Sequence, residues 1–129
     1  MLNLNGVILL SSMYSVEETI NRLVVILHQQ DNRVYARINH QMELFNAGQK
    51  IRPLEFLLFG NPSQGGMVIA ANPIAALDLP LKIIAWEDHM GKVWVAFNED
   101  EYIKKRYMLM DFETSFLKLD KLVLKALKY

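Results

Sequence analysis

A change of hydrophobic period near residue 31 constrains the fold more than any other feature of this sequence. Residues 15–30 repeat apolar side chains every three or four positions, as an amphipathic helix does, and Ser15 and Glu18 form a capping box at its start. After a polar turn at 31–32, residues 33–39 alternate apolar and polar side chains, as a half-buried strand does. The two periods together predict helices packed on a sheet.

Further strand and helix patterns follow along the chain. In the strand at 33–39 we expect one face to carry Val34, Ala36 and Ile38, and the other to carry Arg33, Tyr35 and Arg37. Other strands are expected at 6–13, 54–59, 83–86 and 93–97, the last two as a hairpin, with short helices at 40–47, ended by Gly48, and at 62–71. Asn98 is expected to cap the last helical region, in which Tyr102 to Tyr107 form one helix and residues 112–126 a second amphipathic stretch. The predicted order is β-α-β-β-β-β-α, a single α+β domain over residues 1–129 with two helices on one antiparallel sheet.

Composition excludes several classes of function. Fourteen Lys and Arg residues balance fourteen Asp and Glu residues, so no overall field attracts nucleic acid or an anionic membrane surface. The chain has no cysteine, which excludes disulfides and thiolate sites and is typical of a reducing compartment. No apolar run approaches the length of a membrane span, and the N-terminus has no basic region of a signal peptide. We therefore expect a cytoplasmic protein with neither a nucleic-acid nor a membrane partner.

A glycine-rich turn at 60–66 is the first candidate site. A turn of this kind before a helix can present backbone amides to an anion, but Gly66 and Met67 stand where a Walker A loop needs Lys and Ser or Thr. The turn is therefore interpreted as structural, with Asn61 as the helix N-cap. A small anion or carboxylate bound by the same amides stays open as an alternative.

Titratable and aromatic residues give weaker signals. His40 and Glu43 would share one face of a helix, but two ligands do not complete a metal site, so neither a metal nor a cofactor is expected. Asp78 lies among leucines, where a carboxylate is costly unless it is paired. Trp86 and Trp94 either line a cleft or complete the core, and core packing is the more ordinary role.

Several motifs, taken in order, resemble one family. The motifs are Val34 to His40, Gly48, Pro53, Phe59 to Pro62, Ala76 to Lys82, Trp86 to Asp88 and Gly91 to Val95. Together they are similar to the bacterial domain-of-unknown-function family 302, over about residues 13–109. The resemblance implies a two-layer β-α-β(4)-α fold, with helices on one face of an antiparallel sheet, and a homodimer, but no reaction.

The sequence departs from that family's pattern at three positions. Asn39, Gly66 and Phe97 stand where the family usually has Asp, Thr and Tyr, and each replacement removes a charge or a hydroxyl. These departures favour binding or scaffolding over catalysis. Residues 111–128 lie beyond the usual match and are expected to add a C-terminal helix that covers a sheet edge or extends a dimer interface.

Three functions remain open. The first is a homodimeric small-ligand binding module whose cleft is lined by five residues: His40, Asn61, Asp78, Trp86 and Asn98. The second is an enzyme in which His40 acts as general acid or base, helped by Asp78 or Glu43. The third is a protein interaction module that uses the sheet face or the last helix.

Overall fold

The computed structural model describes residues 5–128, so the two ends of the expected domain lie outside it. Its strands are β1 (Val7–Ser12), β2 (Arg33–Asn39), β3 (Leu54–Gly60), β4 (Leu81–Glu87) and β5 (Val93–Asn98). Its α-helices are α1 (Val16–Gln29), α2 (His40–Asn46), α3 (Pro62–Ala71), α4 (Asp100–Tyr107) and α5 (Asp120–Leu127), and two 3-10 helices are η1 (Pro73–Leu77) and η2 (Ser115–Leu117). None of the helices between residues 5 and 128 has the length and apolarity to cross a bilayer.

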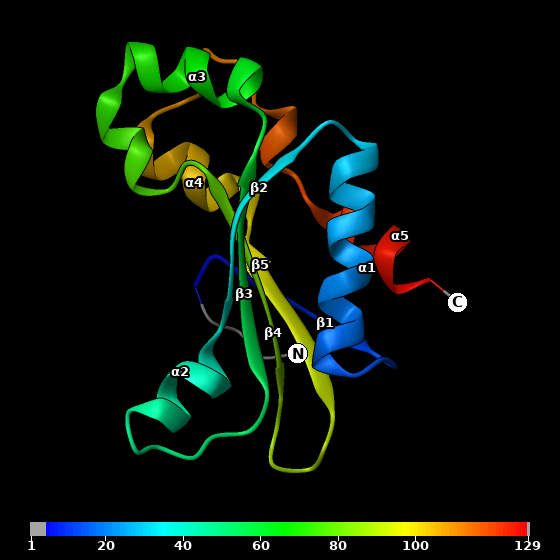
Figure 1. Ribbon diagram of the computed structural model, residues 1–129. Coiled ribbons are helices and arrows are strands. Elements are labelled where there is room, and N and C mark those ends of the chain that lie inside the picture. The colour runs from blue at the N-terminus through cyan, green and yellow to red at the C-terminus, as the bar shows by residue number, and fades with distance from the viewer. Residues whose placement is uncertain (1–4, 129) are drawn as a thin grey trace.

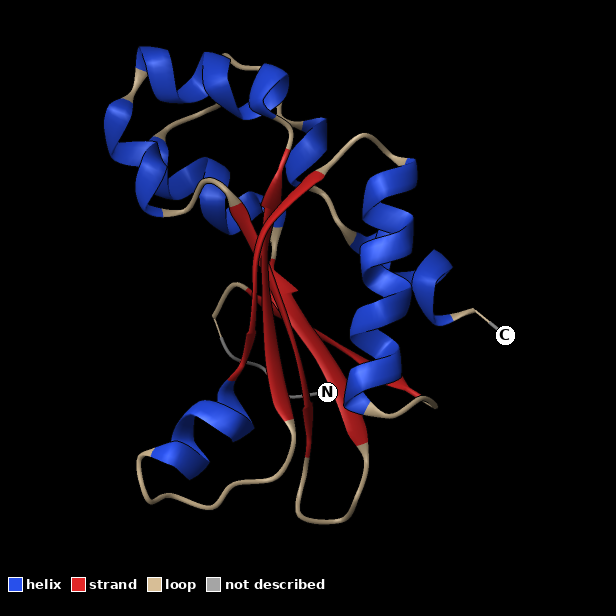
Figure 2. Ribbon diagram, in the orientation of Figure 1, coloured by secondary structure: helices blue, strands red, loops and turns tan. Residues whose placement is uncertain are grey.

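All five strands form one antiparallel sheet in the order β1-β5-β4-β3-β2. The expected hairpin is β4–β5, in which Trp86 pairs with Trp94. Figure 2 shows this sheet in red with α1 and α5 on the same side of it. The α+β class and the β-α-β(4)-α arrangement predicted from the sequence are therefore confirmed.

The core lies between α1 and the sheet. Ser15 caps α1 by accepting a hydrogen bond from the Glu18 amide at 3.1 Å, and the helix then buries Ile20, Leu23 and Leu27 completely. From the sheet, Leu57, Ile83 and Val95 are equally inaccessible. Each fully buried aliphatic side chain stabilises the fold by about 1.5–3 kcal/mol, so this layer dominates the stability of the domain.

Helix α5 packs on α1, to the right of the sheet in Figure 1. Arg22 on α1 joins the two helices, because its Nε donates to the Ala126 carbonyl at 2.7 Å. The expected C-terminal helix is shorter than residues 111–128, since only η2 and α5 are helical there. The chain that leads into α5 buries Leu117, the last residue of η2, and Leu119, the N-cap of α5, in the core.

A β-bulge in β2 changes the expected arrangement of its side chains. Val34 pairs with Phe59 and Ala36 with Leu58, so Tyr35 is the extra residue opposite β3. The prediction that Val34, Ala36 and Ile38 share one face is therefore wrong. Val34 lies on the α1 face of the sheet, whereas Ala36 and Ile38 lie on the opposite face.

Asn98 is not the cap of the following helix. It pairs with Val7 as the last residue of β5, and Glu99 occupies the N-cap of α4 without a side-chain hydrogen bond. The ladder with β1 continues one residue beyond the apolar run and includes Asn98. Helix α4 ends at Tyr107, and its C-cap Met108 adopts a left-handed conformation with φ 55°.

The sheet face opposite α1 carries a second apolar surface, which we call the distal face. The strand register assigns to it Val7, Leu9, Ile38, Leu54, Phe56, Leu58, Ile84, Trp86 and Trp94. Apart from Leu9, these side chains are only partly buried. Helix α2 extends from one end of the sheet, opposite the end at which α3 and α4 lie (Figure 1).

Candidate functional site

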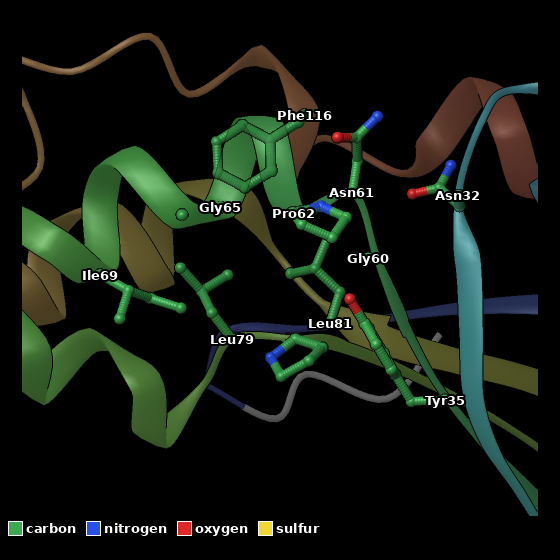
Figure 3. A pocket seen from close by; sticks show the side chains of 12 residues that line it. Asn32, Tyr35, Gly60, Asn61, Pro62, Gly65, Ile69, Leu79, Leu81 and Phe116 are labelled. Carbon is green, nitrogen blue, oxygen red and sulfur yellow. The ribbon is translucent and has the colours of Figure 1, made fainter.

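A cavity of about 180 Å³ lies where β3 leads into α3, close to the start of β2. Figure 3 shows its walls: Ile69 and Leu79 lie on one side, and Asn32 and Asn61 on the other. We call it the Asn61 cavity. It is lined by Asn32, Tyr35, Gly60, Asn61, Pro62, Gly65, Gly66, Ile69, Leu79, Pro80, Leu81 and Phe116. Its lining is mainly apolar, with a few polar groups, as is typical of small-molecule sites.

Tyr35 reaches this cavity from the bulge in β2. Bulges re-aim side chains and are common beside binding sites. Here the tyrosine approaches Gly60, because a Cβ at Gly60 would lie 3.9 Å from Tyr35 Cε2 and 3.5 Å from Pro80 Cβ. A side chain longer than a methyl group at Gly60 would therefore compete for space with these two walls.

Asn61 holds the turn between β3 and α3. Its Oδ1 accepts from the Ser63 amide at 2.9 Å, and its Nδ2 donates to the Asp31 carbonyl at 3.3 Å. The Asn61 carbonyl accepts from the amides of Gln64 and Gly65, both at 3.0 Å. Asn61 is thus the N-cap predicted from the sequence.

The same hydrogen bonds bear on the alternative of an anion at this helix end. Pro62 has no amide hydrogen, and the amides of Ser63, Gln64 and Gly65 already donate to Asn61. An anion bound only by backbone amides needs N–H groups without an intramolecular acceptor. The geometry of the first turn of α3 therefore favours a neutral ligand over a small anion.

Asp78 lies behind one wall of the cavity. Its Oδ2 accepts from the Tyr107 hydroxyl at 2.5 Å and from Arg106 Nη1 at 3.1 Å, and Lys82 Nζ lies 3.6 Å from its Oδ1. Asp78 is 8% exposed, and these partners satisfy the pairing that the sequence predicted for its carboxylate. Burial, followed by the hydrogen bond to Asp78, raises the pKa of Tyr107 to about 12.

This cluster fixes the position of a lining segment. Asp78 directly precedes Leu79 and Pro80, which line the Asn61 cavity. Through Arg106 and Tyr107 the cluster ties that segment to the end of α4. Asp78 is therefore a positioning residue for the cavity and does not itself line it.

His40, Trp86 and Asn98 lie elsewhere, on the distal face. The His40 ring contacts Phe56 edge-on, with centroids 6.1 Å apart. Trp86 lies opposite Leu54 and Trp94, and Asn98 lies opposite Val7 and borders a shallow hollow that includes Phe56. The seven residues of β3 place its two ends about 20 Å apart, with His40 near one end and Asn61 at the other.

The five residues expected to line one cleft are therefore divided among three places. Asn61 lines the cavity, Asp78 supports its wall, and His40, Trp86 and Asn98 share the distal face. Asp78 hydrogen-bonds to Tyr107 and Arg106 rather than to His40. Within residues 5–128, no three His, Asp or Glu side chains gather as metal ligands.

The acidic residues Glu87 and Asp88, at the end of β4 and the start of the following loop, have structural roles. Asp88 accepts hydrogen bonds from Trp94 Nε1 and from the amides of Met90 and Lys92, each at 2.9 Å. The Trp94 bond, followed by the Lys92 amide, lowers the pKa of Asp88. Glu87 forms an ion pair with Arg52 at 2.9 Å. Both carboxylates therefore serve contacts within the hairpin and its neighbouring loop.

Sequence reasoning missed most of the cavity lining. Alternation assigned Tyr35 to a polar strand face, and no glycine or proline in β2 signals the bulge that moves it. Phe116 was assigned to an amphipathic helix, but it lies in η2, next to the core rather than on α5. The available signal was the turn at 60–62, which identified Asn61.

The sequence matches a known protein family, and the fold is similar to that of a solved structure. The family model described as "Domain of unknown function DUF302" matches residues 8–125, beyond both ends of the 13–109 segment expected from motifs and into α5. A crystal structure of an uncharacterized conserved DUF302 protein from Bacillus stearothermophilus superposes with a TM-score of 0.74 at 18% identity, over 96% of this chain and 97% of that one. This likeness shows a common fold.

Longer curated proteins share part of the sequence. The chain is 33% identical over 105 residues to proteins named fluoride-specific ion channel FluC 1 in Brucella suis biovar 1 (strain 1330) and Brucella abortus biovar 1 (strain 9-941). The match covers 81% of this chain but 41% and 39% of those proteins. The chain therefore spans about two-fifths of the length of these relatives.

Proposed function

We propose, from the premise that this chain belongs to the DUF302 family, that it is a small-ligand binding module whose site is the Asn61 cavity. The observation that carries the proposal is a preformed cavity of about 180 Å³ with apolar walls and polar groups at one side. Sites of this composition are the usual location of small-molecule binding in a domain without an evident catalytic constellation.

Two further features support this location. The bulge that turns Tyr35 toward Gly60 interrupts an otherwise regular strand, and such irregularities concentrate at binding sites. The Asp78 cluster uses a nearly buried carboxylate to hold the segment that continues into Leu79 and Pro80. Rigid walls reduce the entropy that a ligand loses by ordering its site.

The names of the curated relatives describe whole proteins of which the shared segment is less than half. Fluoride is a small anion, and the Asn61 cavity has neither a charged lining side chain nor an unpaired amide in the first turn of α3. We therefore do not propose fluoride as the ligand of this cavity. The absence of cysteine supports a reducing compartment, and we propose the cytoplasm.

The test compares two variants of one glycine that lines the cavity. A Cβ at Gly65 meets no atom within 4 Å, so Gly65→Phe places a ring in open space at the cavity, whereas Gly65→Ala adds only a methyl group. Both remove a glycine from α3, which should favour the helix by about 0.8–1 kcal/mol for alanine and by less for phenylalanine. Thermal-shift and calorimetric screens against metabolites should find a ligand that binds the wild type and Gly65→Ala but not Gly65→Phe.

A second substitution separates the Asn61 cavity from the distal face. His40→Ala should leave the affinity of that ligand unchanged, because His40 lies near the other end of β3. Loss of binding in His40→Ala with retention in Gly65→Phe would move the site to the distal face. A screen in which no compound distinguishes Gly65→Phe from Gly65→Ala would refute the proposal.

We propose that the module is a homodimer and that the distal face forms its interface. This face is apolar and only partly buried, and α2 extends beside it with Met42 and Phe45 exposed by 55% and 60%. A hollow on the same face includes Phe56, Ile84 and Ala96. An exposed apolar helix and an apolar hollow on one surface suit a two-fold contact, in which each copy offers both parts.

Equilibrium sedimentation tests this interface. Phe45→Ser should weaken the dimer, because it removes an exposed ring from α2 without disturbing the core. Met67→Ser is the matched control, since Met67 is 73% exposed on α3 at the other end of the molecule. Equal dissociation constants for the two variants would contradict the assignment, and a monomeric wild type would eliminate it.

A further inference from the structure

The lining of the Asn61 cavity bears on the charge of its ligand, an inference that rests on the proposed binding function. No Asp, Glu, Lys, Arg or His side chain is among the residues that line it. The amides of Ser63, Gln64 and Gly65 already have acceptors in Asn61. A charged ligand would leave water for a mainly apolar site without gaining a counter-charge, which is unfavourable.

The size of the cavity suits a single ring. Its volume is about 180 Å³, slightly more than the roughly 150 Å³ of an apolar protein cavity that accepts benzene. Drug-sized ligands occupy pockets of about 300 Å³ or more. One six-membered ring with a small substituent fills this space, whereas most of a nucleotide or coenzyme would lie outside it.

The distribution of lining groups gives such a ligand an orientation. Figure 3 shows Ile69 and Leu79 on one side of the cavity, and the amides of Asn32 and Asn61 on the other, with the Tyr35 hydroxyl directed inward between them. Asn32 donates one hydrogen bond from Nδ2 to the Gln30 carbonyl at 3.3 Å, which leaves its Oδ1 as an acceptor. A ring can pack on the apolar side while its substituent faces Tyr35 and Asn32.

We infer that the Asn61 cavity binds a neutral one-ring compound that carries a hydrogen-bonding substituent, such as an amide or a hydroxyl group. The ring contacts Leu79, Ile69 and Phe116, and the substituent reaches Tyr35 and Asn32. The site therefore discriminates by charge, rejecting carboxylates of the same shape. This selectivity comes from missing counter-charges rather than from steric exclusion.

Benzamide and benzoate are suitable probes, because they have nearly the same shape and differ in charge at pH 7. Amide chemical shifts of the ¹⁵N-labelled full chain should change on titration with benzamide, centred on residues 60–66 and 79–81. Such a small compound should bind with a dissociation constant on the order of a millimolar. Benzoate should bind at least about ten-fold more weakly, equivalent to about 1.4 kcal/mol.

Two variants make the assignment specific. Gly65→Phe should abolish the benzamide shifts, and Gly65→Ala should retain them, because Gly65 lines the cavity and only the larger side chain is long enough to fill part of it. Tyr35→Phe should weaken benzamide several-fold while the spectrum stays that of the folded protein, because Tyr35 is an exposed residue of an edge strand.

The outcomes separate this inference from the proposed function. Equal binding of benzamide and benzoate at the cavity would overturn charge selectivity but leave a ligand site. If neither probe binds while a larger metabolite binds the wild type and not Gly65→Phe, the one-ring inference is wrong and the binding module stands. If Gly65→Phe weakens the binding of neither probe and of no screened metabolite, both proposals fail.

Discussion

The Tyr107→Phe substitution tests the cluster that supports the cavity wall. It removes a hydroxyl that donates to Asp78 Oδ2 at 2.5 Å, and the two residues are 6% and 8% exposed. A hydrogen bond to a charged group contributes about 1.5–3 kcal/mol. Because Arg106 and Lys82 still neutralise Asp78, we expect a loss of about 2 kcal/mol in the free energy of unfolding.

Urea denaturation measures this loss. With a slope of about 2 kcal/mol per molar urea, the midpoint should fall by about 1 M. The control is the same substitution in an Asp78→Asn background, where the acceptor is neutral and the cost should drop to about 0.5–1.5 kcal/mol. If Tyr107→Phe costs the same in both backgrounds, the hydroxyl does not act through the Asp78 carboxylate and the reasoning is refuted.

Three further predictions concern other parts of the molecule. Arg37→Met should lower the free energy of unfolding by about 2–3 kcal/mol, because it leaves the carboxylate of Glu55, a residue that is 7% exposed, without its ion-pair partner. In a Glu55→Met background the same substitution should lower the free energy of unfolding, measured by urea denaturation, by less than about 1 kcal/mol. The raised pKa of Tyr107, about 12 against 10.0, contributes stability that is fully present below pH 10 and lost toward pH 12, so the stability difference between wild type and Tyr107→Phe should shrink over that range. Gly6→Ala should lower the melting temperature, because φ is +73° and the new Cβ would lie 2.5 Å from Tyr102; an unchanged melting temperature would contradict that contact.

Most of the fold followed from local patterns. The strand at 33–39 and the helix at 62–71 were predicted with the bounds that the structure has, because alternation marks the first and an Asn-Pro start marks the second. The C-terminal helix was predicted too long, since Phe116 and Leu119 have helical spacing from their neighbours but lie outside α5. The conformation of that segment depends on the burial of Leu117 in the core, which a local sequence pattern does not predict.

The candidate site was less accessible to sequence reasoning. Asn61 was identified because a capped turn has a local signature, and Asp78 because a carboxylate among leucines needs partners. Those partners, Arg106 and Tyr107, lie almost 30 residues away along the chain, as the separations of 28 and 29 show. His40 was grouped with Asn61 by residue type, but the length of β3 separates them.

The bulge at Tyr35 also bears on how this sheet resists polymerisation. β2 is one of the two edges of the sheet, and a regular edge offers its backbone to any incoming strand. The extra residue breaks the spacing of those backbone groups, and Arg33 and Arg37 add charge beside it. A substitution that removes the bulge from β2 should therefore have two effects. It would displace Tyr35 from the Asn61 cavity, and it would create a regular edge strand that promotes aggregation.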